Sequence, residues 1–548
     1  MSKTRSWIRA GVLVSVLGLI AGACSTSTKK DTAAPAGDQR IERVRMVGGQ
    51  MGYPTPYAYS KGPGLAMTDL AFDTLLWKDA SGKMIPWLAT SWQMSPDGKE
   101  WRFTLREGVK WQDGQPLTAE DVVFTYEYDT TGPGKSALGV IGQIPVTGTA
   151  IEAPNVVVLK LATPYAPFED TVAGRVPIIP KHIWQNVTDP AKFRDPTALI
   201  GSGPYRVAAW DDVAGSYAYD ADDSWWGGPP KVKRVEFVAS GNDLLSLQRG
   251  EVDVASPSGI VEQALAPFEN NDRYGILTAP GESTTALHFN LTKGFPYDNK
   301  QFRQAMATSL DRPDMVKRLL LGRGEVANTG NVANSHPMVA PNLPTYSLDV
   351  TKAKSMLDAL GIKDVTGDGM RELPDGQAFQ PELFVATGTV KTGELMKEYL
   401  RAVGIDLQIK SVDQATHDQS VAGGNYNMAL VGYGGLGGDP DWLRQRLSSK
   451  IQSRTFLRVQ GFNNPRFEEL AAAQLVTTDV AQRTQMIQEM QRIVADELPV
   501  LALTLATRTT VYDKTVFDAW YYTPGAVFGL VPGLINKHVF VTGKQVGF

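Results

Sequence analysis

Apolar and polar positions alternate with two different periods along this chain, which predicts strands and helices in mixed order. In the segment 91–106, Trp101, Phe103 and Leu105 alternate with polar residues. The tripeptide Pro96-Asp97-Gly98 just before them has the composition of a tight turn. We therefore expect an antiparallel hairpin over 91–106.

Farther along, apolar positions recur every three or four residues, the spacing of one face of a helix. Residues whose side chains accept hydrogen bonds from free backbone N–H groups precede several of these runs. We expect helices that begin after Thr118, Asp298 and Asp349. Asp121 stands at the third helical position after Thr118, where it can complete a reciprocal capping pair.

Two more helices are expected near the C-terminal end. The first covers 392–403 and leads into a strand over 405–409. The second carries five apolar residues on one face: Met486, Ile487, Met490, Ile493 and Val494. No internal repeat follows residue 40, so the pattern predicts an α/β protein with mixed sheets.

The N-terminal segment has the pattern of an export signal. Three basic residues precede an apolar run over 10–20, and small residues at 21–23 lead to Cys24. This run is shorter than the roughly 20 residues that span a bilayer. We expect 1–23 to be a lipoprotein signal peptide, Cys24 to be lipidated, and 24–40 to form a flexible tether. An ordinary secretory signal that ends near a cysteine is the alternative.

Composition narrows the function classes. The chain has 548 residues, 54 basic and 58 acidic, with a net charge of −4 and no basic tract, which argues against a nucleic-acid partner. Cys24 is the only cysteine, so a disulfide within the chain and a cysteine metal site are excluded. The length predicts two or three domains.

One segment resembles a known family nearly residue for residue. Pro86–Tyr126 reads PWLATSWQMSPDGKEWRFTLREGVKWQDGQPLTAEDVVFTY and resembles the signature of the family 5 extracellular solute-binding proteins, the dipeptide and oligopeptide receptors of bacterial ABC importers. Shorter blocks follow in the family's order: 201–205, 225–229, 248–253, Asn290, 303–305 and 311–312.

The resemblance implies a periplasmic-binding-protein-like bilobal α/β fold with a hinge and an extra inserted domain. Lobe one is expected over 41–70, 200–287 and 505–548, the inserted domain over 71–199, and lobe two over 288–504. The chain would be a monomer, held by its lipid to the outer face of the cell membrane or the periplasmic side. It would capture a solute between the lobes and deliver it to a membrane permease and its ATPase, because a ligand that favours the closed state shifts the population toward it.

The family's ligand loop is expected within Tyr426–Trp442, after a strand over 427–431. Its glycines let backbone approach a ligand closely, and Asp439 is expected to cap the next helix with Pro440 at its first position. The predicted ligand-binding residues are Tyr433, Gly434, Gly435, Leu436, Asp439 and Trp442. Two alternatives are a dinucleotide site, since 432–437 matches GxGxxG, and a loop that only turns the chain.

Leu436 departs from the family pattern. Peptide-binding relatives carry an aspartate at this position, which pairs with the ligand's ammonium group, and Asp439 or Asp441 would have to replace it. Peptides remain the first expected ligands and oligosaccharides the second. A nickel or haem receptor using His336 or His417 is a weaker alternative, and a lipid-anchored hydrolase has no motif to support it.

No catalytic residues and no cofactor are expected, except for one segment that resembles a calcium-binding loop. Asp364, Thr366, Asp368 and Asp375 occupy positions 1, 3, 5 and 12 of a segment with glycine at position 6, the spacing of a calcium-binding loop. Position 12 is aspartate rather than glutamate, which weakens bidentate ligation. A turn without metal is therefore the preferred interpretation, and a structural calcium ion the alternative.

Overall fold

The structure is a computed structural model that describes residues 40–59, 62–138, 144–256, 262–451, 455–525, 534 and 536–543. The predicted signal peptide, the tether as far as residue 39 and Cys24 lie outside these residues. Residues 40–548 cluster as one compact unit, which contains all the described helices and strands. No helix in the described part of the chain has the length and apolar character needed to cross a membrane.

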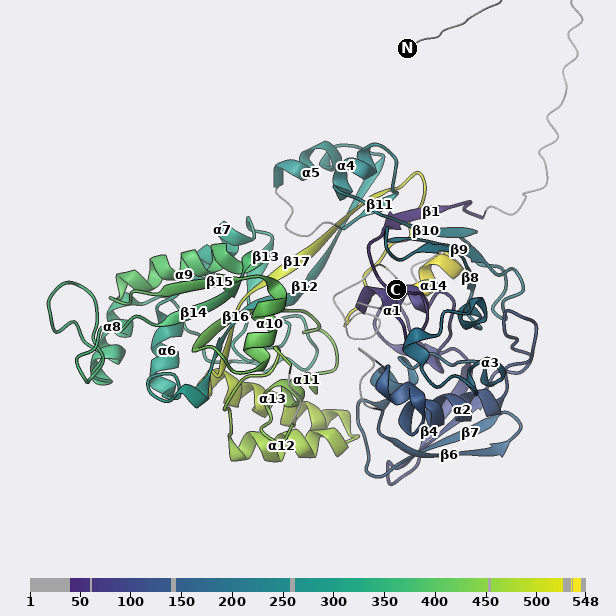
Figure 1. Cartoon of the computed structure of the whole chain (residues 1–548), viewed down its shortest axis with the longest axis horizontal. Coiled ribbons are helices and arrows are strands. Elements are labelled where there is room, and N and C mark those ends of the chain that lie inside the picture. The colour runs from purple at the N-terminus through teal and green to yellow at the C-terminus, as the bar shows by residue number, and fades with distance from the viewer. Residues whose placement is uncertain are drawn as a thin grey trace, which may run out of the picture. The chain divides into compact units, whose positions relative to one another are not determined.

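Within the described residues the strands form sheets of eleven, four and two strands (Figure 1). The largest has the order β15-β14-β16-β12-β17-β11-β1-β10-β9-β8, with β13 paired to β17 beside this path. It contains parallel and antiparallel pairs, as predicted for mixed sheets. Its strands are β1 Val44–Val47, β8 Tyr205–Asp211, β9 Ser216–Ala221, β10 Arg234–Val238, β11 Val254–Ala255, β12 Tyr274–Phe289, β13 Gly324–Val326, β14 Glu382–Ala386, β15 Gln408–Val412, β16 Met428–Tyr433 and β17 Val500–Asp513.

Two long strands join the two halves of this sheet. β12 and β17 pair antiparallel from Tyr274 to His288 on β12, and Figure 1 shows them side by side. On one side β17 also pairs with β11, and on the other side β12 also pairs with β16. The sequence-based borders at 287/288 and 504/505 fall inside these strands, and the borders themselves stay predictions.

The apolar cores follow the same division. One cluster combines side chains between Val44 and Val254 with a C-terminal group that includes Phe517, Trp520 and Phe540. Two further clusters draw only on residues between 286 and 505. Burial of apolar surface is the main stabilising term in folding, so distant parts of the chain fold onto the first core while the central part builds its own.

The predicted hairpin is confirmed. β4 (Ala89–Met94) pairs antiparallel with β5 (Glu100–Leu105), and β7 (Val156–Leu161) and β6 (Val146–Ala153) complete this four-stranded sheet. Its buried face includes Trp101, which stacks on Phe168 with ring centroids 4.9 Å apart. A separate two-stranded sheet consists of β2 (Leu76–Lys78) and β3 (Met84–Pro86).

Helix starts test the capping predictions. α2 (Ala119–Thr130) begins after Thr118 and α8 (Val350–Ala359) after Asp349, as predicted. The start after Asp298 was wrong by one residue, because Asn299 caps α6 (Lys300–Thr308) and accepts two backbone N–H groups. The other α-helices among the described residues are α1 Gly62–Thr68, α3 Lys181–Trp184, α4 Asp243–Gln248, α5 Glu262–Glu269, α7 Arg312–Leu319, α9 Val390–Ala402, α10 Gln414–Ala422, α11 Trp442–Leu447, α12 Pro465–Val476, α13 Val480–Glu497 and α14 Lys537–Thr542.

The segment 390–412 corrects a second boundary. A helix is present as expected, but α9 runs from Val390 to Ala402. The strand that comes next is β15, Gln408–Val412, rather than 405–409. Ile405 and Leu407 are buried before the strand begins, so their apolar character reflects packing rather than strand pairing.

Asp121 connects α2 to a neighbouring segment. Its carboxylate accepts the N–H of Thr118 at 2.8 Å and the N–H of Lys181 at 2.9 Å. Asp121→Ala leaves both N–H groups without this acceptor, so we expect it to lower the free energy of unfolding by roughly 1–3 kcal/mol. Urea denaturation measures the change. Glu120→Ala, in the same turn but exposed, is the matched control, and an equal loss in both variants would contradict this role.

Candidate ligand site

The glycine-rich segment comes directly after a strand of the large sheet. β16 confirms the strand expected at 427–431, starting one residue later and ending at Tyr433. Residues 434–438, which we call the glycine loop, come next and precede α11. Gly435 has φ of +81°, a conformation that side chains other than glycine rarely adopt. The loop is thus built from residues that permit close backbone approach.

An arginine fixes the two aromatic residues predicted for the site. The Arg446 guanidinium lies 4.2 Å from the ring centroid of Tyr433 and 4.6 Å from that of Trp442. It also donates to the carbonyl of Gly434 at 3.3 Å, and burial lowers the pKa of Arg446. Both rings are only 8 % exposed. Tyr433 and Trp442 therefore pack around a half-buried cation that also holds the first residue of the glycine loop.

Leu436 belongs to the apolar core in its side chain and to the loop in its backbone. The side chain is fully buried within the cluster between residues 286 and 505. Its N–H donates to the carbonyl of Glu282 at 3.1 Å, and its carbonyl accepts the N–H of Ala333 at 3.0 Å. A carboxylate at this position would be surrounded by apolar side chains, which explains the departure at Leu436 in physical terms.

Asp439 and Asp441 are both engaged by arginines of the same chain. Asp439 pairs with Arg483 of α13 through two contacts of 2.6 and 2.7 Å. Asp441 pairs with Arg444 through two contacts of 2.7 Å. α11 begins at Trp442, two residues later than the start expected at Pro440, and Asp439 accepts the N–H of Asp441 at 2.9 Å. That Asp439 also contacts a ligand stays a prediction.

Glu282 is a residue of this region that the sequence pattern did not reveal. It lies in β12, where Pro280–Glu282 stand opposite the single residue Thr507 of β17. Such bulges redirect side chains and occur often beside binding sites. The interruption of a long strand-like run by Pro280 and Gly281 is the sequence signal that could have indicated it.

The carboxylate of Glu282 is buried against two backbone segments. A Cβ on Gly437 would lie 2.1 Å from the carboxyl carbon of Glu282, so only glycine permits this approach. Oε1 accepts the N–H of Gly525 at 3.2 Å, while Oε2 has no hydrogen-bond partner among the described residues. Burial raises the pKa of Glu282 to about 7. The carboxylate is therefore poised between its two protonation states at neutral pH.

The calcium-like loop satisfies its carboxylates with backbone groups. Asp364 accepts the N–H groups of Gly367 and Gly369 at 2.7 and 3.0 Å. Asp368 accepts the N–H of Met370, and Asp375 that of Gln377. In the described ranges no three His, Cys, Asp or Glu residues form a group that could hold a metal ion. Calcium binding by Asp364, Thr366, Asp368 and Asp375 stays a prediction.

The two histidines considered for metal or haem binding have separate surroundings. His336 contacts the carbonyl of Gly438 at 3.0 Å through Nε2, and its Nδ1 accepts the N–H of Met338. His417 is buried and stacks on Phe384 with centroids 5.6 Å apart. His336 thus contacts the end of the glycine loop, whereas His417 packs in the core.

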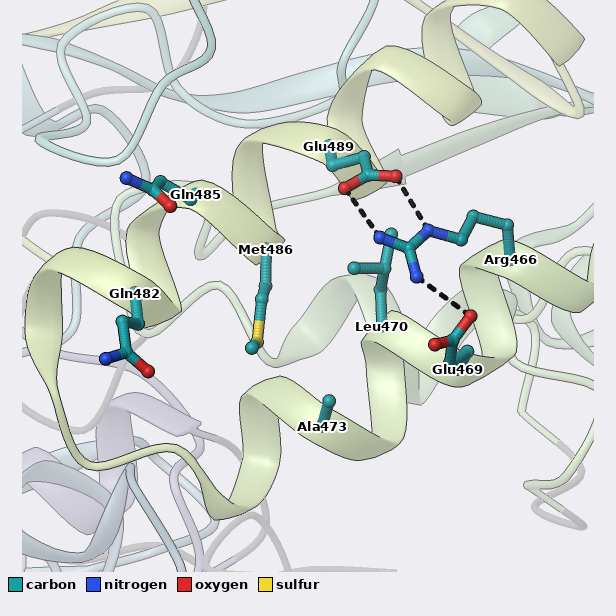
Figure 2. Close-up of a pocket in the computed structure, with 8 residues that line it drawn as sticks. All are labelled: Arg466, Glu469, Leu470, Ala473, Gln482, Gln485, Met486 and Glu489. Atoms are coloured by element: carbon teal, nitrogen blue, oxygen red, sulfur yellow. Dashed lines mark hydrogen bonds and ion pairs between the residues drawn. The ribbon is translucent and has the colours of Figure 1, made fainter.

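A hollow between α12 and α13 provides a contrast to this site. Figure 2 shows Arg466 in the hollow, where it contacts Glu489 at 2.7 and 3.0 Å and Glu469 at 2.8 Å. These exposed charges satisfy one another. The hollow is therefore best described as a gap between packed helices.

Comparison with known proteins assigns the family. The model described as "Bacterial extracellular solute-binding proteins, family 5 Middle" matches residues 83–454, more than half of the chain. The chain belongs to the bacterial extracellular solute-binding proteins of family 5. The family predicted from Pro86–Tyr126 is confirmed.

Curated relatives and solved structures agree with this assignment. A probable D,D-dipeptide-binding periplasmic protein of Escherichia coli is 27 % identical over 75 % of this chain and 77 % of its own length. The oligopeptide-binding protein AppA of Bacillus subtilis, solved with a nonapeptide, has a TM-score of 0.71 at 21 % identity and covers 90 % of this chain and all of its own. A mannohexaose-bound oligopeptide ABC transporter binding protein of Thermotoga maritima has a TM-score of 0.69 at 23 % identity, over 88 % of this chain and 93 % of its own.

These structural similarities confirm the predicted fold class. The chain has the mixed α/β fold of the periplasmic binding proteins in this family. What each relative binds is a property of that relative, so the ligand of this chain has to be inferred from its own residues.

Proposed function

We propose that this protein is the solute-binding component of an ABC importer and that it captures a peptide outside the cytoplasm for delivery to a membrane permease. The observation that carries the proposal is the family match over residues 83–454. The surroundings of the glycine loop support this function. Gly437 of the loop and Gly525 of the C-terminal segment let backbone pack directly against the Glu282 carboxylate, so a charged group lies beside the predicted ligand loop. Binding energy in such a receptor serves to stabilise the liganded state rather than to accelerate a reaction.

Two features favour peptides over oligosaccharides. Proteins named for peptide binding or solved with a peptide recur among the relatives of this chain. The two aromatic residues predicted to bind the ligand, Tyr433 and Trp442, are buried and each has one ring face occupied by Arg446, which leaves little ring surface for stacking on a sugar. The mannohexaose-bound relative keeps oligosaccharides as the second candidate class.

A thermal-shift screen of refolded, ligand-free protein tests this proposal. A ligand that binds only the folded state raises the melting midpoint in proportion to the logarithm of its concentration above the dissociation constant. We expect hits among tripeptides to nonapeptides. Hits confined to cello-, xylo- or manno-oligosaccharides would replace peptides as the ligand class. Chemical conversion of any hit during the incubation would contradict capture without turnover.

Lipid anchoring is the second part of the proposal. The apolar run over 10–20, the small residues at 21–23 and the single cysteine support a lipidated Cys24 that holds the protein at the outer face of the cell membrane. Buried acyl chains contribute about 0.8 kcal/mol per CH₂ group, so more than one chain gives stable attachment.

Cys24→Ser tests the anchor. We expect the wild-type protein to incorporate labelled palmitate and to sediment with membranes, because acyl chains partition into the bilayer. The variant should incorporate no label and should leave the membrane fraction. Equal labelling of both proteins would contradict lipidation of Cys24.

A further inference from the structure

Glu282 carries an inference that rests on the proposed function and specifies its ligand. We propose that Glu282 is the ligand-contacting carboxylate of this receptor and that it selects solutes carrying a cationic amine or guanidinium group. Three features point to this role: the direction in which the bulge of β12 turns the side chain, the surroundings of its two oxygens, and the charges nearby.

The bulge supplies the position. Ala279 pairs with Arg508 and Ser283 with Ala506, so β12 has two residues more than β17 over this interval. Pro280 has no N–H to donate to the sheet, and a Cβ on Gly281 would lie 2.6 Å from the Cβ of Leu505. The extra residues therefore leave the regular ladder and turn Glu282 toward the glycine loop.

Three chain segments meet at the carboxylate. Gly437 packs directly on it, and the carbonyl of Glu282 accepts the N–H of Leu436. Gly525 donates to Oε1, and a Cβ on Gly525 would lie 2.6 Å from the carbonyl of Gly437. At Gly525, whose φ is +68°, the close contact is with backbone and requires glycine, whereas a Cβ at Gly437 would displace the Glu282 carboxylate. Glu282 thus lies where the central segment, 288–504, and the C-terminal segment approach each other through backbone atoms.

The carboxylate has no cationic partner in direct contact among the described residues. Glu282 is 5 % exposed, Oε2 has no hydrogen-bond partner in the described ranges, and none of the ion pairs formed there includes this residue. A buried carboxylate without a partner is costly. Proteins retain such a group where it has a function, and a cationic ligand group would supply the missing partner.

Two of the charged residues on the packed elements form ion pairs with other residues. Lys78 of β2 is the cation that acts on Glu282 electrostatically, but it pairs with Asp170 at 2.8 Å. On the glycine-loop side, Asp439 pairs with Arg483. On β17, Arg508 pairs with Ala279 in the strand register, and its Nε has no hydrogen-bond partner among the described residues. The ionised Glu282 therefore presents a negative charge that these neighbours do not neutralise by direct contact.

The selection experiment compares wild type, Glu282→Gln and Glu325→Gln. Glu325, on β13, already accepts a hydrogen bond from Asn334 at 2.8 Å, so its variant is a control for the same chemical change on a strand paired to β17. Each refolded protein is equilibrated with a synthetic tripeptide library, half of it N-acetylated, and the retained peptides are identified by mass spectrometry. Circular dichroism and the melting midpoint report whether each variant is folded.

The expected result is enrichment of cationic peptides by wild type and Glu325→Gln, and loss of this enrichment by Glu282→Gln. The best-retained peptide and its neutral analogue are then measured by calorimetry. We expect a roughly 10- to 100-fold weaker affinity of Glu282→Gln for the cationic peptide, the range of one charged hydrogen bond, and little change for the neutral one. If Glu282→Gln is unfolded, Gly437→Ala replaces it in the test, because the added methyl group displaces the carboxylate. This variant should lower the affinity for the cationic peptide and leave that for the neutral analogue unchanged.

The pH dependence gives a second readout. A cation binds the ionised carboxylate, and the pKa of Glu282 in the empty site is raised to about 7 by burial. The affinity of wild type for the cationic peptide should therefore fall between about pH 7.5 and pH 5.5, whereas that of Glu282→Gln should not change.

The outcomes separate this inference from the proposed function. Peptide retention by wild type without preference for cations, or the same retained peptides for Glu282→Gln, overturns the role of Glu282 and leaves the receptor function intact. Retention of no peptide by wild type overturns the peptide receptor itself, and the inference with it.

Discussion

Replacing Lys537 by methionine is expected to lower the free energy of unfolding by about 3–5 kcal/mol, the cost of breaking a buried ion pair from one side. Lys537 Nζ lies 2.7 Å from Asp73, and both side chains are fully buried. Asp73 also accepts the indole N–H groups of Trp87 and Trp226 at 2.6 and 3.0 Å. Methionine fills the volume but leaves the negative charge of Asp73 in the core, and urea denaturation followed by tryptophan fluorescence measures the loss.

Two further variants test the cause of this loss. Lys192→Met removes a lysine that forms a 2.8 Å contact with Asp189 at the surface, and we expect no measurable change in the denaturation midpoint. The double variant Lys537→Met with Asp73→Asn removes both charges and keeps an acceptor for the tryptophans, so it should recover part of the stability. Equal effects of Lys537→Met and Lys192→Met would contradict a special role for the buried pair.

The ion pair also connects two segments of the chain that carry the family resemblance. Trp87 lies within Pro86–Tyr126, and Trp226 lies in the 225–229 block, yet both donate to the same aspartate. The Lys537 ammonium lies 4.2 Å from the ring centroid of Trp77 and 5.1 Å from that of Trp87. These residues hold the C-terminal α14 against the N-terminal part of the chain, so the signature reports on the core rather than on the ligand.

Asp439→Ala is expected to produce the second large effect, a loss of roughly 2–5 kcal/mol in stability together with weaker ligand binding. The side chains of Asp439 and Arg483 are 13 % and 7 % exposed, and their paired contacts attach the segment after the glycine loop to α13. Removal of the carboxylate leaves a largely buried guanidinium without its anion. Denaturation in urea and calorimetry with the best peptide ligand measure the two effects.

Arg483→Met separates positioning from ligand contact. If Asp439 only positions the glycine loop, Arg483→Met and Asp439→Ala should lower stability by equal amounts. The two variants should then also lower the affinity for the peptide equally. A much larger loss of affinity in Asp439→Ala would assign Asp439 to the ligand. Arg466→Ala, which removes the exposed pair with Glu489 between α12 and α13 (Figure 2), should change neither quantity measurably.

The hairpin and the helix starts show which parts of the fold the sequence can predict. Local signals sufficed for β4 and β5 and for the starts after Thr118 and Asp349, because the turn and capping residues act on their immediate neighbours. They failed by one residue at α6, because Asp298 and Asn299 are adjacent residues of similar capping ability.

Long-range pairing explains what the sequence could not predict at the site. The sequence predicts Asp439 as a ligand-binding residue, because its ion-pair partner Arg483 is 44 residues away in the chain and local patterns do not reveal the pair. The sequence shows Leu436 only as a departure from the family's aspartate. Its role in the core is not evident there, because its side chain is buried by segments spread between residues 286 and 505. Glu282 was missed because Pro280 and Gly281 resemble an ordinary turn, and only the register of β12 against β17 reveals the bulge.

We expect this chain to bind a small solute and to return it unchanged. The most direct measurement is to refold the protein free of ligand, equilibrate it with a defined mixture of peptides and oligosaccharides, and identify the retained and released molecules by mass spectrometry. We predict one peptide bound per chain, enriched in cationic members and recovered with its original mass. Retention of no member of the mixture, or recovery of cleaved products, would contradict this claim.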